Sequence, residues 1–243
     1  MEPFRSILKR LTGLENIPSP QSIKMTYQCE KCRDVGFLHP LTPDGKVDYG
    51  STIPCRFCVT KERIQRALNV SSLDSTFKSF KAVTGTEDAL KQAKAILHPA
   101  TKWKMLLFYG LYGCGKTHLL EAISLELWDS GILAPIIIFP RLIGRLKNTF
   151  DTKNPQLFEE VMERYCSQPY LLIDDVGAAG SFTPWSIAQL ERIILARYRA
   201  NLFTVFTTNL DLKDIPQFIV SRFSDPEKGR IVLNSAKDYR PLK

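Results

Sequence analysis

Long apolar segments are what this 243-residue sequence most clearly lacks. No apolar run approaches the roughly 18 residues that a membrane span needs, so we predict that no part of the chain crosses a bilayer. The first residues, MEPFRSILKRL, lack the continuous apolar core of a secretory signal, which disfavours export. Internal repeats and low-complexity tracts are absent as well. These absences predict a cytoplasmic globular protein.

The composition is otherwise ordinary. A hydrophobic fraction of 44% and a charged fraction of 24% are usual for a soluble protein, and the length suits one α/β domain with a small accessory module. The net charge of +8 is compatible with a nucleic-acid partner, although charge alone identifies no binding face.

The first 26 residues are predicted to contain an amphipathic helix. Its apolar residues share one helical face and its basic residues the other: Phe4, Ile7, Leu8 and Leu11 against Arg5, Lys9 and Arg10. Such a helix docks either on the protein itself or on a partner protein. A mitochondrial targeting helix fits less well, because Glu2 and Glu15 interrupt the basic character.

Four of the six cysteines form two Cys-x-x-Cys pairs, Cys29 with Cys32 and Cys55 with Cys58, separated by 22 residues. Each pair can hold one edge of a tetrahedral Zn²⁺, and the intervening loop closes the site. We therefore predict structural zinc in a zinc-ribbon-like module. A redox pair is the alternative, but it would not need two matched copies. His39 could replace one of the ligands.

The chain is predicted to have four regions: an amphipathic segment at 1–26, a zinc-binding module at 27–60, a linker helix at 61–75 and a main domain at 76–243. The main domain alternates strand-like and helix-like segments, which predicts a parallel sheet with crossover helices. Its expected strands are 104–109, 136–139, 170–173 and 202–207, the last of these being the last central strand. Its expected helices include 117–130, one that starts at Asn154-Pro155 and one from Thr183-Pro184 to about 200.

The segment from Gly110 to Thr117, GLYGCGKT, matches the phosphate-loop pattern G-x-x-x-x-G-K-[ST] between a buried strand and a helix. Glycines let such a loop wrap around phosphate oxygens, so that its N–H groups and the helix N-terminus face the anion. Lys116 is expected to reach the β and γ phosphates of ATP, and the Thr117 hydroxyl to ligate Mg²⁺. Cys114 is interpreted as a small filler residue. The predicted nucleotide-binding set is Gly110, Gly113, Cys114, Gly115, Lys116, Thr117 and His118.

Two later strands end in polar residues that would complete this site. The apolar run 170–173 delivers Asp174 and Asp175, and we expect Asp174 to hold the Mg²⁺ while Asp175 orients or deprotonates the attacking water. Asn209 follows the next strand and could hold that water or the γ-phosphate. The alternative for the acidic pair is a solvated turn, which the upstream phosphate loop disfavours, whereas Asn209 taken alone is equally typical of a turn.

Together these motifs resemble the AAA+ ATPases: Walker A, Walker B and a strand-end asparagine as sensor 1. More narrowly, residues 76–242 are similar to the DnaC/DnaI helicase-loader and IstB ATPase group. The resemblance is carried by TFKSF, LLFYGLYGCGKTHLLEAI, LLIDDVGA, TPW, RYRANLFTVFTTN, VSRF and DYR. It implies an AAA+ sheet flanked by helices and lacking a C-terminal lid. It also implies that Arg222 is an arginine finger for a neighbouring subunit's ATP, and Arg240 a sensor 2 residue.

The same resemblance implies a function. A loader would bind a hexameric replicative DNA helicase through its N-terminal zinc module and deliver it to single-stranded DNA, with ATP as the switch. Asp175 stands where many AAA+ proteins have glutamate, so slow hydrolysis is expected. Candidate DNA contacts are Arg141, Arg145, Lys147 and the cluster Arg197, Tyr198 and Arg199.

Three other functions stay open. An IstB-like ATPase that regulates transposition is the main alternative, although that group generally lacks a zinc module. A small-molecule kinase is disfavoured by Arg222, the DYR ending and the lack of an acceptor-binding lid. The last alternative is a nucleotide-sensing adaptor with negligible turnover.

Overall fold

The computed structural model describes residues 27–40, 45–50, 52–55, 57–150, 155–178 and 180–238. The chain forms two compact units, Met1–Cys58 and Val59–Lys243. The predicted helix within 1–26, the Asn154 cap and Arg240 all lie outside the described residues. In the described ranges, no helix has the combination of length and apolar character that crossing a membrane requires.

The smaller unit is built around its cysteines. Two short antiparallel strands, β1 (Phe37–Leu38) and β2 (Ile53–Pro54), pair between the two Cys-x-x-Cys segments. Its buried cluster consists of Cys29, Cys32 and Cys55, against which Leu38 packs. So small an apolar core stabilises little by itself, and a bound metal is a common supplement in modules of this size.

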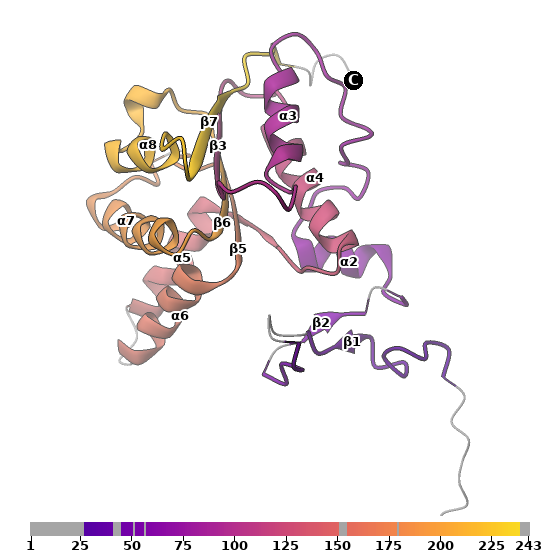
Figure 1. The fold of residues 1–243 in the computed structure, drawn as a ribbon. Helices are drawn as coiled ribbons and strands as arrows, with labels where there is room; N and C mark the ends of the chain where they lie inside the picture. The colour runs from indigo at the N-terminus through magenta and orange to yellow at the C-terminus, as the bar shows by residue number, and fades with distance from the viewer. Residues whose placement is uncertain are drawn as a thin grey trace, which may run out of the picture. The chain divides into compact units, whose positions relative to one another are not determined.

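The larger unit contains a five-stranded parallel sheet in the order β4-β5-β6-β3-β7 (Figure 1). The predicted α/β architecture is thus confirmed, with one strand more than the sequence indicated. The additional strand, β7, lies beside β3 at the edge of the sheet. The strands are β3 (Met105–Tyr109), β4 (Ile136–Ile138), β5 (Tyr170–Asp174), β6 (Phe203–Thr208) and β7 (Gly229–Leu233).

Helices cover both faces of this sheet, as Figure 1 shows. The α7 helix begins as predicted, because Thr183 and Ser186 form a reciprocal capping box and proline occupies the first turn. Phe139 was predicted to end a strand and instead begins α5, where it is fully buried. The helices are α2 (Lys61–Leu68), α3 (Glu87–Ala95), α4 (Lys116–Asp129), α5 (Phe139–Phe150), α6 (Pro155–Ser167), α7 (Pro184–Arg199) and α8 (Gln217–Phe223), with a 3₁₀ turn at Leu212–Asp214.

The sheet separates two apolar cores because successive side chains of a strand point to opposite faces. In β3, Met105 and Leu107 pack with α5, α6, α7 and α8, whereas Leu106 and Phe108 pack with α2, α3 and α4. Helix α2, predicted as a linker, contributes the fully buried Leu68 to the second core. The strand that precedes the phosphate loop is therefore buried on both faces.

Candidate nucleotide-binding site

The residues predicted to bind nucleotide gather at the carboxyl edge of the sheet. The phosphate loop follows β3, Asp174 ends β5, and Asn209 follows β6. Because β5, β6 and β3 are adjacent and parallel, their ends meet at one edge. This edge is where open α/β sheets bind ligands.

Glycine is required in the phosphate loop for conformation and for space. Gly110, Gly113 and Gly115 have φ angles of 144°, 73° and 93°, which side-chain-bearing residues rarely adopt. A Cβ on Gly110 would lie 2.2 Å from the Asn234 carbonyl oxygen, and one on Gly115 would lie 2.9 Å from the Phe80 ring. The loop is therefore packed against both the end of β7 and the segment before α3.

Lys116 lies inside the loop rather than in solvent. Its ammonium donates hydrogen bonds to the carbonyl oxygens of Gly110 (3.0 Å) and Leu111 (2.7 Å), and the side chain is almost fully buried. Cys114 is buried beside it, and its thiol donates to the same Leu111 oxygen at 2.9 Å. The positive charge is thus held where phosphate oxygens would enter the loop.

Asp174 is linked to the loop and to β6 by hydroxyl groups. Thr117 Oγ1 donates to its carboxylate at 3.1 and 3.3 Å, and Thr207 Oγ1 donates to Oδ1. Burial raises the pKa of the Asp174 carboxyl, and the hydrogen bonds from Thr207 and Thr117 partly oppose that rise. A carboxylate and a hydroxyl are ligands that Mg²⁺ prefers, and a cation there would favour the charged carboxylate. These side chains fit the predicted metal.

Asp175 and Asn209 contact each other directly. The Asn209 amide donates to Asp175 Oδ1 at 2.7 Å, and both side chains line the cavity described below. Asp175 has a left-handed backbone (φ 55°), and its N–H donates to Thr207 Oγ1 at 3.0 Å. The turn after β5 therefore directs the second carboxylate into the cavity, while Asp174 faces Thr117 and Thr207.

Thr207 is a site residue that sequence reasoning missed. Its hydroxyl donates to Asp174 and accepts from the Asp175 N–H, so it links both acidic residues to β6. It is fully buried in that strand. The sequence signal that could have indicated Thr207 is a hydroxyl residue near the end of the strand that follows the acidic pair.

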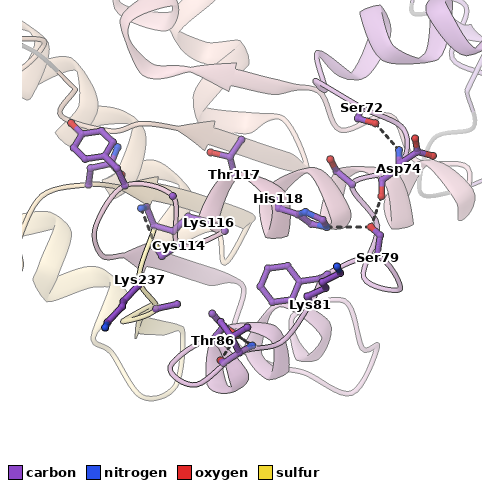
Figure 2. A pocket seen from close by; sticks show the side chains of 18 of the residues that line it. Ser72, Asp74, Ser79, Lys81, Thr86, Cys114, Lys116, Thr117, His118 and Lys237 are labelled. Atoms are coloured by element: carbon purple, nitrogen blue, oxygen red, sulfur yellow. Dashed lines mark hydrogen bonds between the residues drawn. The ribbon is translucent and has the colours of Figure 1, made fainter. Parts of the chain in front are cut away.

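The loop opens into a cavity of about 750 Å³, a volume suited to a nucleotide (Figure 2). One wall beyond the phosphate loop belongs to the segment 72–86, which lies between α2 and α3, and Ala236 and Lys237 line the cavity as well. His118 points to this wall: its Nε2 lies 3.0 Å from the Thr76 carbonyl oxygen and 3.4 Å from Ser79 Oγ. The edge of the Phe80 ring packs against the same imidazole. In this structure, His118 therefore positions the wall rather than the phosphate loop.

The basic residues predicted to contact DNA differ in their exposure to solvent. Arg141, Arg145 and Lys147 are exposed on α5, and the Lys147 ammonium lies 6.0 Å from the centre of the Trp185 ring. Arg199 is exposed at the end of α7. These side chains can reach a ligand.

Arg197 is fully buried, so the prediction that it contacts DNA is wrong. Its guanidinium donates to Thr204 Oγ1 and to the carbonyl oxygens of Tyr165, Gln168 and Phe203, at 2.7–3.0 Å. Two of these carbonyls lie at the end of α6, where a cation is favoured by the helix dipole. Arg197 is a structural residue that joins α6, α7 and β6.

The four cysteines of the smaller unit bring their sulfur atoms within 4.8 Å of one another. Cys29 and Cys55 are 3.7 Å apart, and Cys32 and Cys58 are 3.3 Å apart. Zn–S bonds of about 2.3 Å in a tetrahedron would place the sulfurs about 3.8 Å apart, so the cluster fits Zn²⁺. His39 is not part of this group of ligands; its ring lies against Tyr49.

The sequence and fold are similar to those of bacterial replication proteins. Residues 72–181 match the family model of the bacterial DnaA ATPase domain. The crystal structure of the DnaC helicase loader superimposes with a TM-score of 0.53 at 22% identity, over 66% of this chain and 97% of that one. The main unit has the AAA+ fold. A replication initiator DnaA bound to AMPPCP and single-stranded DNA gives a TM-score of 0.55 at 22% identity, over 67% of this chain and 50% of that one.

The replicative helicase loader DnaI of Bacillus subtilis is 31% identical over 129 residues, which are 53% of this chain. The similarity of the AAA+ domain to the DnaC/DnaI loaders, indicated by its motifs, is therefore confirmed. The match spans only 39% of the DnaI length, and matches to DnaA proteins span about a third of theirs.

Proposed function

We propose that this chain is an ATP-dependent loader of a replicative DNA helicase. The observation that carries the proposal is its 31% identity to a replicative helicase loader, combined with a phosphate loop and acidic strand assembled at one edge of an AAA+ sheet. We further propose that it acts in the cytoplasm.

The site residues have complementary roles in ATP hydrolysis. The phosphate loop and Lys116 bind the phosphates, and Thr117 and Asp174 would hold Mg²⁺, which neutralises charge on the phosphate oxygens. The Asn209 amide orients Asp175, whose carboxylate faces the cavity and can accept a proton from the attacking water. The shorter reach of aspartate supports slow hydrolysis, which suits a timing switch.

Completion of the site requires a second copy of the chain. Arg222 lies on α8 and does not line the cavity of its own subunit. Supplied by a neighbour, its guanidinium would stabilise the charge that develops on the γ-phosphate. Arg240 would act as sensor 2 by the same resemblance.

The accessory functions follow the same proposal. The cysteine cluster binds Zn²⁺ and stabilises the module that contacts the helicase. The exposed cations of α5 contribute to a surface that binds single-stranded DNA. Trp185 and Phe150, whose ring centres are 5.9 Å apart, offer aromatic contacts on this surface. A DnaA relative that binds single-stranded DNA with the same fold supports this assignment.

The test is complex formation between the full-length protein and the hexameric replicative helicase of its own organism, measured by mass photometry with ATP, ADP or no nucleotide. We expect a complex that depends on ATP. Lys116→Ala should remove ATP binding and with it the nucleotide dependence, because the only ammonium inside the described loop is lost. Lys213→Ala is the control, since that side chain is 76% exposed on the 3₁₀ turn and does not line the cavity.

No complex with the intact protein would refute the loader function. A filament on duplex DNA would instead support the IstB-like alternative. Transfer of phosphate to a nucleotide or sugar would show a kinase.

A further inference from the structure

Tyr198, near the end of α7, lies beneath two cationic side chains. The Arg222 guanidinium carbon is 4.9 Å from the ring centre, and the Lys228 ammonium is 4.5 Å from it. Both distances are within the range of cation–π attraction. The sequence suggested that Tyr198 contacts DNA, whereas its ring is engaged by residues of the same subunit.

Tyr198 is also held by two hydrogen bonds. Its hydroxyl donates a hydrogen bond to Asp225, and its backbone carbonyl accepts one from the Lys228 ammonium at 3.1 Å. The first of these bonds raises the pKa of the Tyr198 phenol and lowers that of Asp225, so the ring is neutral and the carboxylate charged at neutral pH. Asp225 also accepts from the Glu227 N–H, which anchors it in the turn after α8.

Arg222 has few other constraints. The backbone is anchored next to it by Phe223, which is fully buried against Phe206. Its own side chain is half-buried and forms no ion pair with any residue that the structure describes. The Tyr198 ring is therefore the feature that limits where the guanidinium can point.

An aromatic face suits this task better than a carboxylate. A carboxylate would neutralise the guanidinium and occupy the N–H groups that bind phosphate oxygens. A ring attracts the cation through its π face and leaves all five N–H donors available. The arrangement thus orients an arginine without consuming its ability to bind an anion.

We propose that Tyr198 is a positioning residue for Arg222, holding the guanidinium ready for the ATP site of a neighbouring copy. The inference rests on the proposed shared site and assigns the residue that makes the arginine effective.

The test is hydrolysis in mixed assemblies of two full-length variants, formed with the helicase and single-stranded DNA. Arg222→Ala is the acceptor, which binds ATP but supplies no finger. Lys116→Ala is the donor, which supplies Arg222 but binds no ATP. Neither should hydrolyse ATP alone, and mixing them should restore activity at the sites formed between them.

Tyr198→Leu is then added to one variant at a time. In the donor, we expect kcat of the mixture to fall about tenfold to hundredfold with KM unchanged, the usual effect of a misplaced catalytic group. In the acceptor, the same change should have little effect, since no arginine is positioned there. Tyr198→Phe in the donor should retain most activity, because it keeps the ring face.

Each other outcome overturns a specific statement. If the unmodified donor and acceptor restore no activity, the shared site is refuted and this inference with it. If they restore activity and the Tyr198→Leu donor does so equally well, only the positioning role is refuted. If Tyr198→Leu lowers the activity of the mixture equally in the donor and in the acceptor, Tyr198 has a general structural role. If Tyr198→Phe in the donor lowers activity as much as Tyr198→Leu does, the ring face does not position Arg222.

Discussion

Replacing the buried Arg197 with methionine tests the core of the AAA+ unit. Methionine fills a similar volume but leaves two buried carbonyl oxygens, a part-buried one and the Thr204 hydroxyl without the guanidinium donors. Hydrogen bonds to charged groups contribute about 1.5–3 kcal/mol each, although they do not add fully. Against this, burial lowers the pKa of Arg197 to about 10, which corresponds to a desolvation cost of roughly 3 kcal/mol that methionine removes.

The balance is a net loss in the free energy of unfolding of about 3 kcal/mol, because buried acceptors left without donors cost about 1–3 kcal/mol each. Urea unfolding followed by tryptophan fluorescence measures it, because Trp103, Trp128 and Trp185 all belong to the larger unit. The exposed neighbour Arg199→Met is the control and should change stability by less than about 0.5 kcal/mol. A loss below about 1 kcal/mol for Arg197→Met would refute the argument.

Two further changes test the metal and catalytic assignments. Cys55→Ser should lower the zinc content from about one ion per chain to a small fraction, because the tetrahedral thiolate set is broken. Metal analysis by mass spectrometry measures the zinc content, and the control Cys166→Ala should keep its zinc. Equal zinc in both variants would exclude the site. Thr207→Val should lower hydrolysis about tenfold to hundredfold, because Asp174 loses a hydrogen bond that orients it and the Asp175 N–H loses its acceptor. Phosphate release titrated with Mg²⁺ checks the second prediction, and an unchanged Mg²⁺ dependence would contradict it.

The phosphate loop and the acidic strand could be predicted because their chemistry depends on short, contiguous spacing. Gly110 to Thr117 follows an apolar strand directly, and Asp174 ends another, so local order in the sequence places both at one edge of the sheet. The paired cysteines were predictable for the same reason, since two close pairs can bring their sulfurs together wherever the loop between them goes.

Features that depend on contacts between distant segments could not be predicted. Strand β7 is five residues long and forms only by pairing with β3, more than 100 residues earlier. Nothing local shows that Arg197 is inside, because its side-chain donors are satisfied by carbonyls brought in by α6 and β6. Thr207 gains its role only when β5 and β6 pair. The region 1–26 and Arg240 remain predictions.

The place of β3 in the sheet has a consequence for how the nucleotide site can move. Its backbone is hydrogen-bonded on one side to β6 and on the other to β7, so β3 is an interior strand, whereas β4 and β7 form the two edges of the sheet. Its amide protons are therefore expected to exchange with solvent more slowly than those of the edge strands β4 and β7. The phosphate loop is thus attached at its start to an interior, buried strand, and we expect adjustment around a ligand on the α4 side or in the segment 72–86.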